Sequence, residues 1–297
     1  MIRIYIFNRK EYEELSFQED FLTSDRREKI ARMKRQEDKE LAACAELLLI
    51  YGLRHFPDVD AVKGRDSGNV PEAGQQIQLP LKLTKDERGK LAFLNLPYFF
   101  NYSHARDFAV CAVSDRPVGV DIEYFRVREI AAADRILHPK EAELLAFISN
   151  PDEKKKYFYE CWVAKESYLK NLGIGLIVRP GDFMVNEDRL MILDKDVSQL
   201  KGHHSINAGS QVLALKSKEK KTEQDEKTKN KDTTLHENLS YLEKRYVHVF
   251  EPGEVRGTDW KFDAGYRIAA CGMEGEKDIL ARQIHAEDIM SVIREVK

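Results

Sequence analysis

Residues 118–123, VGVDIE, combine a β-forming apolar run with two acids, which limits the structures that this segment can adopt. Alternate side chains of a strand share a face, so the apolar residues lie on one side and Gly119, Asp121 and Glu123 on the other. Two carboxylates at this spacing repel, and one should take up a proton unless a positive charge lies between them. The segment therefore predicts a buried strand whose acidic face binds a cation.

Composition places the chain among soluble globular proteins. It has 297 residues, of which 42% are hydrophobic and 33% charged, enough for one large domain or two smaller ones. No apolar run reaches the roughly 18 residues of a membrane span. The first residues, MIRIYIFNRK, lack the order of a secretory signal, and the four cysteines show no C-x-x-C spacing. We therefore expect a cytoplasmic protein with reduced thiols, and the net charge of −3 gives no support for nucleic-acid or membrane binding.

Helical and strand patterns are interspersed in an order that predicts an α+β fold. Helices are expected over residues 21–56, with Thr23 or Ser24 as the cap, over 139–150 and over 153–172, with Gly173 as the C-cap. Strands are expected near residues 2–6, 91–96, 108–114, 118–123, 183–194, 206–216, 245–251 and 265–272. The similar apolar strands 108–114 and 265–272 suggest a duplicated α+β unit.

Two further segments are predicted to be irregular. Residues 57–80 contain Gly, Pro and Gln and indicate a loop. Residues 216–234, KSKEKKTEQDEKTKNKDTT, contain no aliphatic or aromatic residue. Such a segment cannot bury enough apolar surface to offset its ordering entropy, so we predict a disordered, charged insertion.

A helix face adds to the acids of residues 118–123. In CWVAKESYLK, Trp162, Glu166 and Lys170 recur every four residues and share one face. Trp162 is expected to anchor the core beside it, Glu166 offers a third carboxylate, and Lys170 offers a cation. Mg²⁺ is held by carboxylates together with substrate phosphates, so this set is compatible with a magnesium site. The alternative is a solvated strand edge and an ordinary Glu–Lys pair on a helix.

Two basic or polar motifs lie upstream. Residues 26–35, RREKIARMKR, are strongly basic and could form a solvated helix face, a nucleic-acid surface or a phosphate clamp. In NYSHARD, Ser103 and His104 are expected in a turn after an aromatic strand. A single histidine is more often structural than functional, so neither motif identifies a function alone.

In combination, these motifs resemble those of the 4'-phosphopantetheinyl transferases, and most closely those of the larger, surfactin-synthetase-activating (Sfp-type) branch. The similarity extends through DRREKIARMKRQED, ERGKL, FNYSH, VGVDIE and FYECWVAKESYLKNLGIGL. It covers most of residues 20–180 and is weak afterwards. The resemblance implies a pseudo-dimer of two similar α+β halves, residues 1–116 and 117–297, with the active site in the cleft between them.

The resemblance also implies a set of site residues. The metal ligands would be Asp121, Glu123 and Glu166, and the catalytic residues Glu166, Lys170 and His104. The coenzyme A contacts would be Arg26 and Lys29 at the 3'-phosphate, Gly89 and Lys90 near the adenine, and Ser103, His104, Lys165 and Lys170 around the diphosphate.

Two positions depart from the pattern of the family. Relatives often carry a hydroxyl residue on the first long helix, where this chain has Leu41-Ala42-Ala43, and a proline where it has Leu91. Neither departure touches the metal motif. Both bear on the strength of coenzyme A binding.

The function that the resemblance implies is Mg²⁺-dependent transfer of the phosphopantetheine arm of coenzyme A to a serine of an acyl or peptidyl carrier protein, with release of 3',5'-ADP. A monomer would suffice, because an internally duplicated chain supplies both sides of the cleft. The same acids and lysine could instead direct water at coenzyme A, as in a nucleotide pyrophosphatase. A nucleic-acid-binding module is a third possibility, but acids follow the basic run at Glu37, Asp38 and Glu40.

Overall fold

The structure is a computed structural model that describes residues 1–56, 78–86, 89–126, 133–173, 178–185, 191–193, 245–273, 275–276 and 278–296. Residues 57–77 of the loop predicted over 57–80 lie outside the described residues. The predicted strand at 206–216 and the charged segment 216–234 lie outside them entirely. The described part of the chain is a mixture of helices and strands, as the α+β prediction requires.

Two sheets form the centre of the fold. Their strands are β1 (Ile2–Asn8), β4 (Phe99–Ala105), β5 (Phe108–Ser114), β6 (Gly119–Tyr124), β9 (Arg245–Val249), β10 (Tyr266–Met273) and β11 (Ile279–Ile284). The first sheet has the order β11-β1-β5-β4 and the second has the order β6-β10-β9. Pairing is antiparallel except between β1 and β11, which run parallel.

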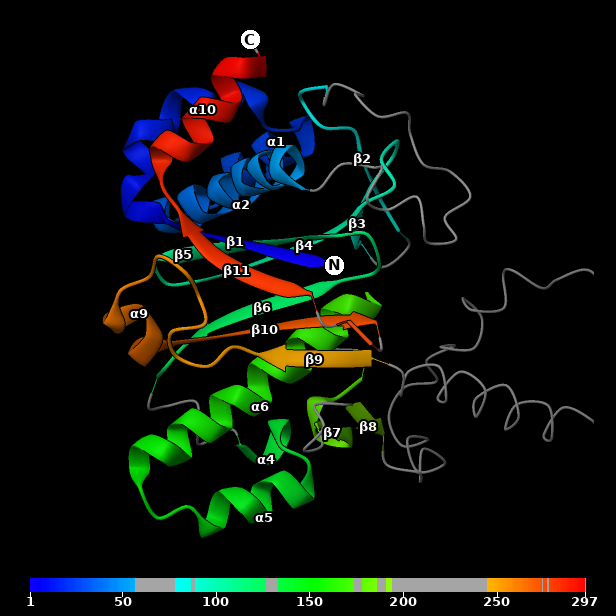
Figure 1. Ribbon diagram of the computed structural model, residues 1–297, viewed down its shortest axis with the longest axis vertical. Helices are drawn as coiled ribbons and strands as arrows, with labels where there is room; N and C mark the ends of the chain where they lie inside the picture. Colours follow the sequence, from blue (N-terminus) through cyan, green and yellow to red (C-terminus); the bar gives the residue numbers. More distant parts are fainter. Residues whose placement is uncertain are drawn as a thin grey trace, which may run out of the picture.

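The sheets stack face to face, with helices on their outer faces (Figure 1). In β1, the isoleucines point to one side, where Ile4 joins Val120 and Ile268 in a core between the sheets. Tyr5 and Phe7 point to the other side, where they join the buried residues of α2 (Gln36–His55). On the second sheet, α6 (Pro151–Leu172) covers the outer face. The result is a helix–sheet–sheet–helix arrangement, set by strands that are apolar on both faces.

Shorter elements connect these layers. They are η1 (Arg9–Phe21), α1 (Ser24–Arg32), β2 (Leu83–Lys85), β3 (Leu91–Phe93), α4 (Ala133–Ile136), α5 (Pro139–Phe147), η4 (Pro180–Asp182), β7 (Phe183–Val185), β8 (Met191–Leu193) and α9 (Trp260–Gly265).

The helix predicted for residues 21–56 is divided in two. The first part, α1, is capped by Thr23, whose hydroxyl accepts a hydrogen bond from the Arg26 amide. It ends at Arg32, and the next residue, Met33, has an extended backbone. The second part, α2, begins at Gln36. The change of direction lets the polar α1 stay at the surface while α2 is buried along most of its length, a distinction that the continuous helical pattern did not reveal.

Two other helices end close to their predicted limits. Helix α5 ends at Phe147, and Asn150 caps the start of α6 by accepting hydrogen bonds from the Asp152 and Glu153 amides. Gly173 is the predicted C-cap of α6 and adopts a φ of 68°, which favours glycine.

The end of the chain departs from the predicted division at residue 116. Strand β11 pairs with β1, and α10 (Ala286–Val296) packs with α2 in the core of the first sheet. Residues 279–296 therefore lie with the first sheet and its core, although they belong to the predicted range 117–297. In Figure 1 they lie beside α2, next to the beginning of the chain.

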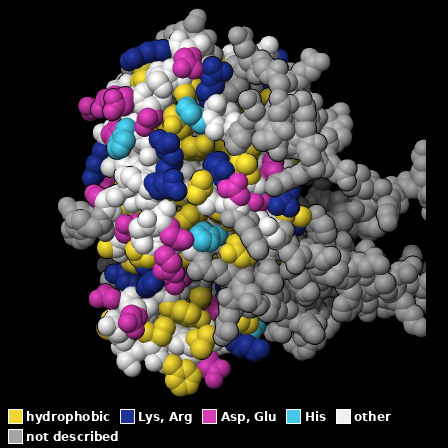
Figure 2. Space-filling view, in the orientation of Figure 1, with side chains coloured by type: hydrophobic (Ala, Val, Ile, Leu, Met, Phe, Trp, Pro, Cys, Tyr) yellow, Lys and Arg dark blue, Asp and Glu magenta, His cyan; other side chains and the backbone are white. Residues whose placement is uncertain are grey.

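No helix in the described ranges is both long and apolar enough to cross a membrane. Hydrophobic side chains do reach the surface over α5, near the lower end of the molecule in Figure 2. Leu144 and Phe147 are 53% and 78% exposed there. The described cysteines, Cys44, Cys111, Cys161 and Cys271, are all buried and free, as expected for reduced thiols.

Candidate active site

The acidic face of β6 lies under α6, and a glycine permits their close approach. A Cβ atom at Gly119 would lie 2.0 Å from the Ser167 carbonyl oxygen and 2.4 Å from the Asn171 amide nitrogen. Only a glycine therefore allows the backbone of α6 to rest on β6 at this point. The contact brings the helix face of Glu166 and Lys170 next to Asp121.

Three side chains from three elements meet at this point. Lys170 on α6 donates hydrogen bonds from Nζ to Asp121 Oδ1 on β6, at 2.6 Å, and to Ser103 Oγ on β4, at 2.8 Å. Ser103 Oγ in turn donates to Asp121 Oδ1 at 2.8 Å. The sequence predicts a cation beside Asp121. In this structure the ammonium group of Lys170 lies there.

Asp121 retains a second oxygen that is not satisfied. The residue is 2% exposed, and its buried Oδ2 has no hydrogen-bond partner among the described residues. Glu166 lies near Asp121. Burial raises the pKa of the Glu166 carboxyl group, and the negative charge of Asp121 raises it further. An unpaired buried oxygen and a second acid beside it form a site with an affinity for positive charge.

The third predicted carboxylate, Glu123, is engaged elsewhere. Its Oε1 accepts a hydrogen bond of 2.8 Å from Trp162 Nε1. Trp162, expected as a core anchor, is half-buried, packs against a core cluster that includes Phe158 and Tyr159, and also orients this acid. Within the described ranges, no group of three His, Cys, Asp or Glu side chains is arranged to hold a metal ion. The three-carboxylate set therefore stays a prediction.

A group of basic side chains borders these acids. Surrounding protein, and then the positive charge of Lys170, lower the pKa of His104, with smaller contributions in the same direction from Lys29 and Arg26. Burial and the charge of Arg26 likewise lower the pKa of Lys29. These mutual effects place Arg26, Lys29, His104 and Lys170 in one positive region, next to the acids, which suits a polyanion.

The hairpin around Ser103 and His104 differs from the prediction. Both residues belong to β4 rather than to a turn, and the turn follows at Arg106 and Asp107. Arg106 takes a φ of 51°, so the reversal occurs without the glycine that usually signals it. As strand residues, Ser103 and His104 are held by the sheet rather than by a loop.

Lys90 stabilises a helix end. Its Nζ donates to the carbonyl oxygens of Lys170 at 2.7 Å and Asn171 at 2.6 Å, at the C-terminus of α6. Burial lowers its pKa to about 8. Gly89, with a φ of 84°, provides the turn that brings Lys90 there. The ammonium of Lys90 is thus committed to the end of α6.

Lys165 is not brought to the site. It is fully buried, and its Nζ lies 2.5 Å from Glu141 Oε2 and donates to the carbonyl oxygens of Ile136, Pro180 and Phe183. Adjacent helix positions point about 100° apart, so Lys165 faces α5 and η4 while Glu166 faces β6. Its predicted contact with coenzyme A is not compatible with this placement.

Two asparagines that the sequence analysis did not single out hold the site together. Asn101 Oδ1 on β4 accepts a 3.0 Å hydrogen bond from the Val120 amide on β6. Asn171 Nδ2 donates to the carbonyl oxygens of Pro117 and Cys271, both at 2.9 Å. The sequence does contain an indication that Asn101 has a structural role, since an amide side chain is unusual inside a strand. The sequence contains no such indication for Asn171, because its hydrogen-bond partners are distant along the chain.

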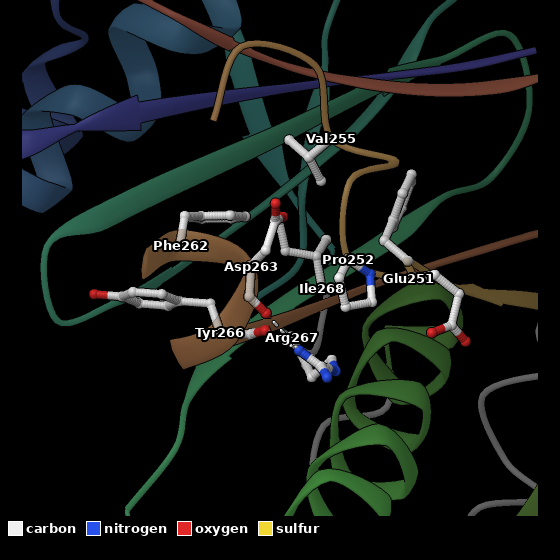
Figure 3. Close-up of a pocket in the computed structure, with 9 residues that line it drawn as sticks. Glu251, Pro252, Val255, Phe262, Asp263, Tyr266, Arg267 and Ile268 are labelled. Carbon is white, nitrogen blue, oxygen red and sulfur yellow. Dashed lines mark hydrogen bonds between the residues drawn. The ribbon is translucent and has the colours of Figure 1, made fainter. Parts of the chain in front are cut away.

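A pocket elsewhere in the fold does not add to this site. It lies between β10, α9 and the loop that precedes α9, and Arg267 is its buried cation (Figure 3). That guanidinium already donates to the carbonyl oxygens of Asp263 and Tyr266, both at 2.8 Å, and to Glu160 at 3.2 Å. The acids and cations described above do not line it.

Comparison with known proteins finds a family match over part of the chain. The profile of the 4'-phosphopantetheinyl transferase superfamily matches residues 117–216, which include Asp121, Glu123, Glu166 and Lys170. The predicted resemblance to this superfamily is therefore confirmed.

Three relatives illustrate the similarity. The chain is 33% identical over 105 residues to the 4'-phosphopantetheinyl transferase gsp of Aneurinibacillus migulanus, covering 35% of this chain and 44% of that protein. It is 40% identical over 101 residues to a 4'-phosphopantetheinyl transferase of Bacillus subtilis, covering 33% and 44%. With the transferase Sfp of Bacillus subtilis (strain 168), the identity is 29% over 167 residues, covering 56% and 66%. The similarity thus spans less than two thirds of the length of each of these relatives.

Proposed function

Because residues 117–216 carry the sequence pattern of the 4'-phosphopantetheinyl transferase superfamily, we propose that this chain transfers the phosphopantetheine arm of coenzyme A to a serine of an acyl or peptidyl carrier protein. The observation that carries the proposal is the meeting of Ser103, Asp121 and Lys170, from three elements, beside Glu166. Acids next to a positive region suit a reaction at a diphosphate, where charge neutralisation and alignment matter most.

The residues present suit a magnesium ion. Asp121 has an unsatisfied buried oxygen, and Glu166 has no hydrogen bond within the described ranges, so both carboxylates can act as oxygen ligands, with Glu123 as the third. When bound, Mg²⁺ supplies charge neutralisation at the diphosphate. Trp162 orients Glu123, and Ser103 orients Asp121.

The proposed reaction forms one bond and breaks one. The carrier serine oxygen attacks the phosphorus that bears the pantetheine arm, and the bond from that phosphorus to the bridging oxygen breaks. The bridging oxygen keeps the electron pair and leaves as part of 3',5'-ADP, where Lys170 stabilises its charge. Glu166 accepts the serine proton.

The positive region is proposed as the binding surface for the rest of coenzyme A. Arg26 and Lys29 would meet the 3'-phosphate, His104 and Ser103 the diphosphate, and the Gly89 loop the adenine. Burial is the main cause of the lowered pKa values of His104 and Lys29, and the positive charge of Arg26 contributes to both.

We also propose that the two halves form a pseudo-dimer with the site at their junction. In the first half the strands β1, β4 and β5 are arranged β1-β5-β4, with α2 following β1; in the second, β6, β9 and β10 are arranged β6-β10-β9, with α6 following β6. The two orders correspond strand for strand. A single cytoplasmic monomer would then supply both sides of the site, Ser103 from one half and Lys170 from the other.

Intact-mass measurement of apo carrier proteins tests the proposed function. The full chain is incubated with coenzyme A, Mg²⁺ and several apo carriers, and we expect one of them to gain one phosphopantetheine per serine, with an equal amount of 3',5'-ADP. Release of 3',5'-ADP at the same rate without any carrier would instead identify a pyrophosphatase. Failure of every carrier, together with salt-sensitive retention of nucleic acid on a filter, would favour the binding module.

Coenzyme A binding should strengthen as the pH falls, through His104. The pKa of the His104 imidazole is lowered by surrounding protein and by Lys170, with Lys29 and Arg26 acting in the same direction and Asp38 opposing them, so the neutral ring is favoured in the free protein. A bound anion would raise that pKa, so binding takes up a proton and the affinity increases from about pH 8 to about pH 6.

Titration calorimetry in buffers of different ionisation enthalpy measures this uptake. His104→Gln should remove it and flatten the pH profile relative to the natural chain. His248→Gln is the matched control, because His248 lies on β9 beside Glu254 and should leave the profile unchanged. Equal proton uptake by the His104 variant and the natural chain would contradict the prediction.

A further inference from the structure

Helix α2 carries one acid inside its apolar segment. Glu46 lies between Ala45 and Leu47 and is 1% exposed. Burial of a carboxylate is costly unless charge and hydrogen bonds compensate for it, so the contacts of this residue indicate its purpose.

The Glu46 carboxylate holds the start of α1 and one arginine at the same time. Oε1 accepts a hydrogen bond of 2.6 Å from the Thr23 amide, and Oε2 accepts one of 3.3 Å from the Thr23 hydroxyl. Oε2 also accepts a 2.9 Å hydrogen bond from Arg26 Nε. The Thr23 hydroxyl accepts from the Arg26 amide at 3.3 Å, so backbone and side chain of Arg26 are fixed together.

Arg26 is held from a second direction by β4. Its guanidinium carbon lies 4.8 Å from the centroid of the Tyr102 ring. Tyr102 immediately precedes Ser103 and His104 in that strand. Arg26 is therefore clamped between α2 and β4, at the edge of the positive region, with Nε occupied by Glu46. Arg26 is 7% exposed, and the pair with Glu46 through Nε is the one ion pair that it makes with the described residues.

Helix α2 offers little else to an anion at this end. Leu41, Ala42 and Ala43, which lack a side-chain hydroxyl, are buried. Recognition on this side thus depends on Arg26 and Lys29, and a guanidinium that is already fixed loses less entropy on binding.

We propose that Glu46 is a positioning residue for the 3'-phosphate of coenzyme A, which it serves by fixing Arg26 in the orientation that binds this group. The inference rests on the proposed function, since it assigns a task to Glu46 within that site. A residue that only stabilised the fold would affect coenzyme A and 3'-dephospho-coenzyme A equally, whereas a positioning residue affects the discrimination between them.

The test compares the dissociation constants of these two ligands for the full chain by titration calorimetry. The natural chain should bind coenzyme A at least about tenfold more tightly than the dephospho form, as expected for charge-assisted hydrogen bonds. Glu46→Gln should reduce this ratio by about tenfold with little change for the dephospho form. Glu46→Asp, which keeps the charge, should restore part of the ratio.

Glu40→Gln is the matched control, because Glu40 lies on the same helix and pairs with Arg9 at 3.0 Å, outside the site. Should Glu46→Gln fail to fold, Arg26→Lys keeps the charge but loses the Nε donor, and should reduce the ratio similarly. An unchanged ratio in a folded Glu46 or Arg26 variant overturns the inference, as does a natural chain without discrimination. Transfer to the carrier is measured separately by mass. Loss of the inference about Glu46 and loss of the proposed function can therefore be distinguished.

Discussion

Asp121→Asn is expected to reduce phosphopantetheine transfer by at least about a thousandfold, which corresponds to about 4 kcal/mol of transition-state stabilisation. The amide keeps the size of the side chain but cannot offer two anionic oxygens. The buried Oδ2, unpartnered among the described residues, would be replaced by an uncharged group, and Lys170 would lose the carboxylate that it contacts at 2.6 Å. Both the proposed metal site and the orientation of Lys170 depend on this charge.

Transfer to an apo carrier at saturating coenzyme A and Mg²⁺ measures this effect, and the thermal midpoint reports folding. Electron paramagnetic resonance of Mn²⁺ measures cation binding independently, and the variant should bind Mn²⁺ at least about tenfold more weakly. Asp278→Asn is the control, since Asp278 pairs with Arg3 at the surface and its loss should leave transfer unchanged. An Asp121 variant with more than a tenth of the natural rate would exclude the proposed role of this acid.

Much of the local structure was predictable because periodicity is a local property. The strand over residues 108–114 was predicted with its observed bounds, and Gly173 was recognised as the C-cap of α6 from residue type alone. The division of VGVDIE into an apolar and an acidic face also proved correct. Val118, Val120 and Ile122 lie in the core between the sheets, and the acidic face lies under α6.

What the sequence left undetermined depends on partners that are distant along the chain. Lys165 and Glu166 are adjacent in the motif, yet one pairs with Glu141 and the other approaches Asp121. The pairing of β11 with β1 likewise joins the two ends of the described chain, which no local pattern reports. The predicted role of Arg26 needed its partner Glu46, which an apolar helical stripe gave no reason to single out.

These cases have one physical cause. Hydrophobic periodicity specifies which face of an element is buried, but not which element covers it, and a charged side chain in a buried face takes its function from that neighbour. For the candidate site, this means that the acids could be recognised from the sequence. The hydrogen-bond partner of each carboxylate oxygen could not be predicted. Asp121 and Glu123 share a face, but the first binds Lys170 and the second binds Trp162.

Gly119→Ala is expected to affect the fold and the site together, with a loss of at least about 3 kcal/mol in the free energy of unfolding. The added methyl group would lie 2.0 Å from the Ser167 carbonyl oxygen and 2.4 Å from the Asn171 amide nitrogen, both backbone atoms of α6. Because backbone atoms cannot move aside by a change of rotamer, the whole helix must shift from β6. Glu166 and Lys170 would move with it, so transfer should fall as well.

Chemical denaturation and the mass assay measure the two effects in one preparation. Gly181→Ala is the matched control, since its added carbon would lie 3.4 Å from the Leu137 carbonyl oxygen, an ordinary contact, and should change stability by less than about 1 kcal/mol. A loss of stability without a loss of transfer would mean that α6 returns to its place despite the methyl group. Unfolding within about 1 kcal/mol of the natural chain would mean that α6 does not rest on β6 at this residue, and the site geometry derived from that contact would have to be abandoned.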